Sequence, residues 1–493
     1  MRSLHSFRST AFLAVILAML GGCAVGPDFV RPNTPAADRY TVESPPEATV
    51  VADQQVQRFV AGTAVPADWW QLFKSAPLDA VVREAIASNP TLQASEASLR
   101  QSQYNLRAGY GVFFPLLGVE AVAARERLVP AQEGLRTAPT IFNLITLSGT
   151  VSYALDLFGG ERRTVEGLKA QVDYQRYLNY AAYLSLSANV VNTSIARAAY
   201  QAEVRATEQL IELQRQQLHA TEVRVRAGTA AYTDVLSLQS QLAASQAALA
   251  PLRQQISRAE DLLATLEGAV PSRATLPEID LSALSLPGDL PLSLPSELVR
   301  QRPDILASEA QLHAASANIG VATAAMLPSV SLSATYGGAG SSLDSMSAAT
   351  GRFWSIGPSA TIPVFQGGRL WYGRKAAIDA YEAAQGRYRQ TVLDAFEQVG
   401  DALEALEHDA QTLQAQADTM RTAGEALRLV QVNYQAGLVA YLDVWAADVQ
   451  FHQANIGYLQ ALAQRYQDTV ALYVALGGGW WNAPGPNVSR EVP

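Results

Sequence analysis

A heptad pattern of apolar residues runs through the C-terminal half of the chain. Every seventh position from 392 to 434 is apolar, and small or apolar residues lie four positions after the first five of these: Val392, Val399, Leu406, Leu413, Met420, Leu427 and Tyr434, then Phe396, Leu403, Ala410, Ala417 and Gly424. This repeat is typical of helices that pack as coiled coils. No proline occurs from just after Gly368 to Ala436, so we predict one helix of about 67 residues, roughly 100 Å long.

The same pattern occurs 209 residues earlier in the chain. The matching positions are Tyr183, Val190, Arg197, Val204, Ile211, Leu218 and Val225, and only Arg197 departs from the apolar rule. The motif AGxxAYxDV at 227–235 returns at 436–444, an offset of 437 − 228 = 209 residues. A unit of this length is too long for a solenoid repeat and predicts two equivalent halves.

Each long helix is expected to end at a glycine. Gly228 and Gly437 follow the two proline-free stretches, where a left-handed glycine commonly ends a helix. A second amphipathic helix follows each glycine, at about 233–266 and 442–476. We therefore predict one helical hairpin in each half.

Before each long helix, the helical period gives way to alternation. In the second half, apolar Val330, Leu332, Ala334 and Tyr336, and later Trp354, Ile356, Ala360, Ile362 and Val364, alternate with Ser, Thr and Gly. The first half has Leu147, Val151, Tyr153, Leu155 and Leu157, with 117–123 as a weaker partner. Half-buried strands of a soluble sheet are the alternative, but uncharged polar faces favour membrane strands around a water-filled lumen. The loops are expected at 126–146 and 337–352.

The strand count predicts an oligomer. Four strands cannot close a barrel, and a bilayer leaves no open sheet edge because each unsatisfied backbone group in hydrocarbon costs several kcal/mol. Two copies would give about the smallest filled barrel, whereas 3 × 4 = 12 strands leave room for a channel. The sequence therefore predicts a trimeric or larger tube.

The N-terminus has the features of an export signal. Two arginines precede an apolar run of about ten residues, too short to span a bilayer, and Leu20-Gly21-Gly22-Cys23 follows. Cys23 is the only cysteine, so no intramolecular disulfide forms. The box resembles the bacterial lipoprotein cleavage site, which implies that Cys23 becomes the acylated first residue and, with Ala24 next, goes to the outer membrane. An ordinary signal peptide is the alternative.

These landmarks divide the chain into six segments. They are a signal peptide (1–22), a lipid-anchored arm with short helices (23–88), a first repeat (89–268), a proline-rich linker (269–301), a second repeat (302–479) and a C-terminal tail (480–493). Each repeat is expected to run helix, strand pair, long helix, helix. Asp68 and Ser296 are predicted to cap the helices that follow them, and 78–88 is predicted to be an amphipathic helix.

Composition gives little support for catalysis or nucleic-acid binding. A formal net charge of −9 offers no basic stripe for a phosphate backbone. His219, His313, His408 and His452 lack metal-site spacing, and Gly337 to Gly340 lie between strands rather than in a phosphate loop. We expect no enzyme activity, no cofactor and no metal.

Several stretches together resemble the TolC-like outer-membrane efflux factors, and more closely their lipoprotein (NodT-type) subgroup. They are Cys23 to Phe29, Trp69 to Phe73, Leu294 to Leu298, Arg302 to Ile305 and Ala475 to Trp480. The resemblance covers the mature chain and implies a mostly α-helical homotrimer with a 12-stranded outer-membrane β-barrel and a long periplasmic α-helical barrel. It further implies a periplasmic adaptor protein, an inner-membrane resistance-nodulation-division transporter and export of drugs, toxic compounds or metals.

The resemblance also implies a gate at the hairpin tips. Asp443 falls on an acidic gate ring, Tyr434 and Asp234 with Thr233 match an inter-helix latch, and Leu442 is a candidate apolar ring. Val439 stands where a latch arginine occurs and Ala446 where a second gate aspartate occurs, so a full latch and a double ring are in doubt. The alternative for Asp234 and Asp443 is helix N-capping alone.

Other functions fit less of the sequence. A duct for protein secretion is the second channel hypothesis. A lipid-anchored coiled-coil envelope protein would explain the heptads but not the strands, and an adaptor lipoprotein should have one hairpin flanked by small β-domains.

Overall fold

The structure is a computed structural model that describes residues 24–33, 37, 39–42, 46–63, 65–129 and 138–482. The signal peptide, Cys23 and the last part of the C-terminal tail lie outside the described residues. Two compact units are present, one from 99–175 and 308–388 with the start of the mature chain, the other from 33–98, 176–307 and 389–493. Each sequence repeat contributes to both units.

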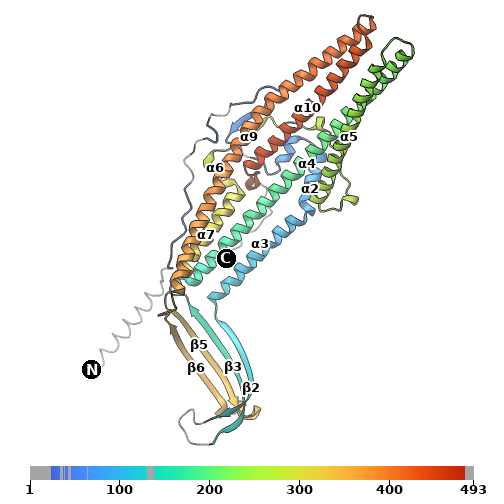
Figure 1. Ribbon diagram of the computed structural model, residues 1–493. Coiled ribbons are helices and arrows are strands. Elements are labelled where there is room, and N and C mark those ends of the chain that lie inside the picture. The colour runs from blue at the N-terminus through green and yellow to red at the C-terminus, as the bar shows by residue number, and fades with distance from the viewer. Residues whose placement is uncertain are drawn as a thin grey trace. The chain divides into compact units, whose positions relative to one another are not determined.

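The predicted order of elements is found twice. The first repeat contains α3 (Pro90–Gly109), β2 (Leu116–Leu128), β3 (Thr140–Leu155), α4 (Gly160–Arg226) and α5 (Tyr232–Leu266). The second contains α7 (Pro303–Ala324), β5 (Ser329–Gly340), β6 (Arg352–Thr361), α9 (Arg369–Gln435) and α10 (Tyr441–Ala475). Both long helices have 67 residues and both returning helices have 35, so the duplication is preserved in length. Each pair forms a hairpin (Figure 1).

The heptad positions are buried along part of each long helix. Val392, Val399, Leu406 and Leu413 are at most 3% exposed, and Val190 and Ile211 are similarly buried. Arg197, the one departure from the pattern, is also buried because its guanidinium donates to Glu260 Oε1 (3.0 Å) and to the Pro277 carbonyl (2.8 Å). Toward the hairpin tip, Met420 and Leu427 are only half-buried and Tyr434 is exposed.

The four long strands form one antiparallel sheet in the order β2-β3-β5-β6 (Figure 1). The register brings the predicted polar positions together: Ser148 lies opposite Gly337, Thr150 opposite Thr335, and Ser331 opposite Ser359. Two of these pairs are hydrogen-bonded, Thr150 Oγ1 with Thr335 Oγ1 and Ser331 Oγ with Ser359 Oγ. One face of the sheet is therefore polar, and the opposite face carries exposed apolar side chains such as Leu117, Val119, Tyr336, Trp354 and Ile356.

Both predicted loops are shorter than expected. β2 continues to Leu128 and β3 begins at Thr140, so the strands extend into the predicted loop 126–146. In the second repeat β5 runs through the glycines to Gly340, and the short helix α8 (Leu343–Ser347) follows. Ser342 and Ser345 form a capping box that starts α8. The loop prediction for Gly337 to Gly340 was wrong because glycines there let α8 pack closely on β5.

Two of the predicted helix caps were wrong. Asp68 does not cap the 3-10 helix η1 (Trp69–Phe73); its carboxylate accepts from the Gln71 side chain instead. Helix α6 (Pro295–Gln301) begins one residue before Ser296, so Ser296 is not its cap. The other bounds are β1 Arg58–Ala61, α2 Ala76–Ser88, η2 Tyr110–Phe113, η4 Pro271–Arg273, η5 Leu281–Ala283, β4 Asp289–Leu292, η6 Ala349–Gly351 and η7 Trp480–Asn482.

A parallel strand pair was not predicted from the sequence. β1, in the N-terminal arm, pairs with β4, in the linker between the repeats. Among the described residues, no helix combines the length and the apolarity needed to span a bilayer.

Candidate functional site

The tips of the two hairpins have the same backbone geometry. Gly228 and Gly437 adopt φ of +73° and +74°. In each turn the glycine N–H and the N–H of the next residue donate back to carbonyls of the last helical turn, as in a Schellman motif. The backbone then turns at Ala231 and Ala440, and the returning helices begin at Tyr232 and Tyr441.

The tip aspartates lie in the first turn of the returning helices. The Asp443 carboxylate accepts from the Ala440 N–H at 2.8 Å, so it reaches back over one turn rather than capping from the N-cap position, which Ala440 occupies. Asp234 has the matching position after Ala231, and within the described chain its carboxylate accepts no hydrogen bond. Both carboxylates remain exposed, and a negative charge is favourable there because of the helix dipole.

Tyr434 lies at the end of α9, where its ring packs on Tyr441. The ring centroids are 5.3 Å apart at an interplanar angle of 59°. Tyr434 and Leu442 are 43% and 50% exposed, and Thr233 is exposed beside Asp234. The described part of this one chain contains no Tyr434–Asp234 hydrogen bond. A latch between two copies is not tested by one chain and stays a prediction.

Each hairpin is joined at its root to the first helix of the same repeat, through one side chain. The Asn89 amide donates to the Leu266 carbonyl at the end of α5 (2.8 Å), while its oxygen accepts from the Leu92 N–H in α3. Arg302 donates to the Ala475 carbonyl at the end of α10 (2.9 Å) and precedes α7. Each of these two residues directly precedes the proline that begins the first helix of its repeat, and each satisfies a helix C-terminus that would otherwise lack a partner.

Glycines allow the close approach at both junctions. A Cβ on Gly268 would lie 2.5 Å from the Ser88 carbonyl oxygen, and a Cβ on Gly477 would lie 3.3 Å from the Gln301 carbonyl oxygen. Both glycines have positive φ. The two junctions are therefore equivalent in backbone as well as in capping.

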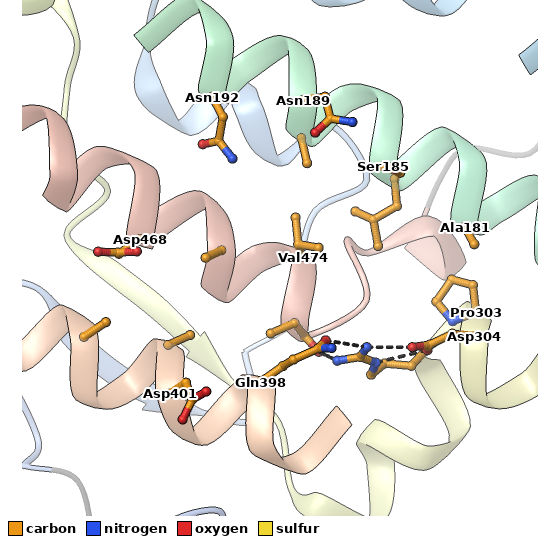
Figure 2. Close-up of a pocket in the computed structure, with 17 residues that line it drawn as sticks. Ala181, Ser185, Asn189, Asn192, Pro303, Asp304, Gln398, Asp401, Asp468 and Val474 are labelled. Atoms are coloured by element: carbon orange, nitrogen blue, oxygen red, sulfur yellow. Dashed lines mark hydrogen bonds and ion pairs between the residues drawn. The ribbon is translucent and has the colours of Figure 1, made fainter. Parts of the chain in front are cut away.

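Arg302 makes more contacts than Asn89. Its guanidinium also donates to both carboxylate oxygens of Asp304 (2.6 and 3.1 Å) and to Gln398 Oε1 in α9 (2.8 Å). Figure 2 shows these contacts to Asp304 and Gln398 at one end of a cavity of about 590 Å³. The cavity is lined mostly by alanines and by Asn189, Asn192, Asp401 and Asp468. Arg302 thus ties α7, α9 and α10 together.

A second buried polar network lies farther along α10. Arg465 is fully buried and donates to Gln57 Oε1 (3.0 Å) and to Thr49 Oγ1 (3.2 Å), both in the N-terminal arm.

Burial and the neighbouring Asp468 raise the pKa of the Asp409 carboxyl to about 8. The carboxyl groups of Asp409 and Asp468 can share a hydrogen bond only when one of them is protonated. With both ionised, the buried Asp409 Oδ2 has no hydrogen-bond partner among the described residues.

His452 is buried nearer the tip of α10. Its Nε2 lies 3.7 Å from Asp448 Oδ1, and burial lowers the pKa of the imidazole while it raises the pKa of the Asp448 carboxyl. Both shifts favour the neutral forms of this pair. No group of three or more metal-ligating side chains occurs among the described residues.

The segment from Val25 to Phe29 is held by a cluster of charged and aromatic groups. The buried Arg163 guanidinium donates to Asp28 and to Glu166, both at 2.7 Å, and to the Val25 carbonyl. The Phe29 ring stacks on His313, with centroids 4.3 Å apart. We call this set the N-terminal clamp; it fixes the backbone that directly follows Cys23.

These features coincide with similarity to known proteins. Residues 81–269 and 294–478, well over half of the chain, match the outer membrane efflux protein family. The chain belongs to this family. It is 27% identical over 500 residues to the toluene efflux pump outer membrane protein TtgC of Pseudomonas putida, with 99% of each chain covered. It is 28% identical over 485 residues to nodulation protein T of Rhizobium leguminosarum, covering 97% of this chain and 94% of that protein.

Solved structures agree with this assignment. The outer-membrane channel OprN has a TM-score of 0.83 and 27% identity to the chain, covering 93% of this chain and all of that one. The expected resemblance, the TolC-like fold and the outer-membrane location are confirmed. As an outer membrane efflux protein, the chain contributes the outer-membrane part of an efflux pathway.

Sequence reasoning missed the residues that hold the hairpins and the arm in place. Arg163 and Arg465 were not singled out because their partners lie far away in the sequence, 135 positions for Asp28 and 408 for Gln57. Asn89 and Arg302 both directly precede a proline that begins a helix, but their shared capping role is visible only in the structure. The signal in the sequence was an arginine on an otherwise alanine-rich helical face, because a charged side chain on a buried face needs a partner.

Proposed function

We propose that three copies of the chain form a passive, gated exit duct across the outer membrane. The observation that carries this proposal is the four-stranded sheet, which has one polar face and one apolar face. Its edge strands, β2 and β6, have no further partner among the described residues. In hydrocarbon those edges must be paired, and pairing β2 of one copy with β6 of the next closes a barrel of 3 × 4 = 12 strands. The polar faces then line the lumen.

The helical hairpins would continue the duct into the periplasm. Each copy supplies two hairpins of equal length, and the heptad positions left half-buried near the tips in a single chain are available to neighbouring copies. We further propose that an adaptor protein engages the tips and that an inner-membrane resistance-nodulation-division transporter supplies the energy. Family membership and the similarity to the toluene efflux protein support small molecules as the cargo.

The tip residues are proposed as the gate. Three Asp443 carboxylates about 6 Å apart would repel by roughly 0.7 kcal/mol per pair in a water-like dielectric, too little to hold the pore in one state. A Tyr434–Asp234 hydrogen bond between neighbouring helices would contribute about 1.5–3 kcal/mol, so three copies reach roughly 4–9 kcal/mol. Switching a two-state gate takes about 5.5 kcal/mol, which such a latch can supply. Leu442 and Thr233 complete the proposed constriction and latch.

The proposal is tested on the full-length, processed protein. We expect a trimer by mass in mild detergent and discrete conductance steps in planar bilayers. Material that stayed monomeric and never conducted ions would refute the duct. Acylation of Cys23, also proposed, is read from the mass of the mature N-terminus, with Cys23→Ser as the control.

The gate assignments have separate tests. Tyr434→Phe removes the phenol donor and should raise single-channel conductance, whereas Tyr372→Phe, an exposed tyrosine at the start of α9, should not. Unchanged conductance in Tyr434→Phe would exclude the latch. Asp443→Asn should reduce cation preference in the reversal potential, and an unshifted potential would exclude Asp443 from the pore lining.

A further inference from the structure

The charged residues of the sheet are sorted by sign between its two faces. In the four strands, glutamates occur at 120 and 126 and arginines at 125, 127 and 352. The register places Arg125 opposite Asn143, Arg127 opposite Ile141 and Arg352 opposite Gly338. Following the alternation across the sheet, all three arginines lie on the apolar face and both glutamates on the polar face.

The arginines also share one height on that face. Helices α3, α4, α7 and α9 connect to the sheet at the opposite end from α8, next to Leu117 in β2 and Ala360 in β6. Arg125 lies 125 − 117 = 8 residues from Leu117, and Arg352 lies 360 − 352 = 8 residues from Ala360. Eight residues correspond to about 27 Å of strand, or roughly 21 Å along the membrane normal at a tilt near 40°.

This height matches the outer boundary of the membrane. The apolar band of an outer-membrane barrel is about 25 Å tall. From Leu117 to Ala123 and from Ala360 to Trp354 the apolar face carries no charge, and the arginines come directly after. They are therefore positioned where lipid headgroups of the outer leaflet begin.

The three guanidinium groups are free to bind a ligand. Their side chains are exposed, and within the described part of the chain none of them forms an ion pair or a hydrogen bond. The described connection from 341 to 351 contains one carboxylate, Asp344 of α8, and it forms no ion pair with Arg352 there. No carboxylate of the strands shares their face.

Barrel closure would bring the arginines of two copies together. Arg125 and Arg127 belong to edge strand β2, and Arg352 belongs to the opposite edge strand, β6. If copies join edge to edge, as proposed above, each seam collects all three arginines at the outer rim. This inference therefore rests on the proposed trimer.

We propose that Arg125, Arg127 and Arg352 form a binding site for the phosphorylated glycolipid of the outer leaflet, one site at each seam between copies. Guanidinium groups bind phosphate through paired, charge-assisted hydrogen bonds, and the glycolipid headgroup presents phosphates at this depth. The bound lipid joins two copies and stabilises the seam.

The test compares two lipids and two variants of the full-length trimer in detergent. The probes are bisphosphorylated lipid A and the same lipid after enzymatic dephosphorylation. The test variant is Arg125→Gln/Arg127→Gln/Arg352→Gln. The control, Arg215→Gln/Arg253→Gln/Arg421→Gln, removes the same charge from exposed helical positions.

We expect the wild type and the control to bind the phosphorylated lipid more tightly than the dephosphorylated one, with a preference that falls as salt rises. A basic residue at an anionic membrane surface is worth roughly fivefold in binding, so the triple variant should lose about hundredfold. Equal binding of the two lipids by the wild type would overturn the proposal, even if the triple variant failed to assemble. So would an unchanged preference in an assembled variant.

Conductance separates this inference from the duct itself. The triple variant should form channels with the ion selectivity of the wild type, because its substitutions face away from the lumen. A changed selectivity would place the arginines in the lumen and refute the lipid site. Wild-type protein that neither trimerised nor conducted would instead refute the proposed function.

Discussion

Replacing Arg302 by methionine should loosen the junction between α10 and α7. Methionine keeps most of the aliphatic length but has no donor, so the Ala475 carbonyl, the Gln398 amide oxygen and the Asp304 carboxylate each lose a partner. Arg302 is 6% exposed, so water does not readily replace the lost hydrogen bonds. The junction should therefore open more often than in the wild type.

The size of the effect follows from these contacts. A hydrogen bond from a charged donor contributes about 1.5–3 kcal/mol, and two of them reach neutral acceptors at this junction. Asp304 is 43% exposed on its side chain, so its ion pair adds little. We expect a loss of about 3–5 kcal/mol in local stability, the range found when one partner of a buried ionic contact is removed.

Amide hydrogen exchange on the assembled protein measures this loss directly. A loss of about 3 kcal/mol corresponds to roughly 150-fold faster exchange, expected for the amides of 474–476 in the last turn of α10. The matched variant Asn89→Ala removes two neutral hydrogen bonds and should accelerate exchange at the end of α5 by only about 30-fold, from about 2 kcal/mol. Each variant should leave the other junction unchanged. Unaltered exchange at 474–476 in Arg302→Met would refute the capping role.

Three further predictions concern other parts of the chain. The pKa of Asp409 is raised from 3.8 to about 8, so the fold favours its protonated form. The stability that this proton contributes should be complete below the ordinary pKa, fall as pH rises to about 8 and stay constant above it; a pH-independent midpoint equal to that of Asp409→Asn would contradict this. Gly437→Ala should cost about 1 kcal/mol in thermal unfolding because of its positive φ, whereas Gly386→Ala within α9 should be neutral or stabilising; equal shifts would exclude backbone strain. Arg163→Gln should speed exchange of 25–29 at least tenfold while Arg162→Gln does not, and identical exchange would refute the N-terminal clamp.

Much of the fold follows from periodicity in the sequence. The heptads identify the parts of α4 and α9 nearest the hairpin tips, and the proline-free stretches that contain them give the helix length within a residue or two. The strand faces were also predictable, because alternation has a fixed period of two and the register then aligns the polar positions. The loop prediction was wrong at Gly337 to Gly340, because glycine is common both in turns and where two elements pack closely. The contact of these glycines with Met346 shows that close packing is the reason here.

Contacts between distant segments of the chain could not be predicted from the sequence. Arg465 occupies an ordinary helical position, and its burial depends on Gln57 and Thr49 from the other end of the chain. The β1–β4 pair joins two proline-containing stretches that lack any strand pattern. The tip residues were identified through the family resemblance. Their proposed partners belong to other copies, so the structure of one chain does not show these contacts.

Burial along the hairpins indicates where the free energy of the proposed gate would reside. The α9 heptad positions are buried within the chain down to Leu413, but Met420 and Leu427 are half-buried and Tyr434 is exposed. Arg302 joins both helices of the same hairpin, α9 and α10, to the start of α7. Packing within one chain therefore fixes the root, and the tip gains most of its contacts only from neighbouring copies in the proposed trimer. In the proposed trimer, an adaptor acting at the tips would open the duct by exchanging contacts between copies, at a cost of a few kcal/mol. The buried heptad contacts within each chain would stay packed.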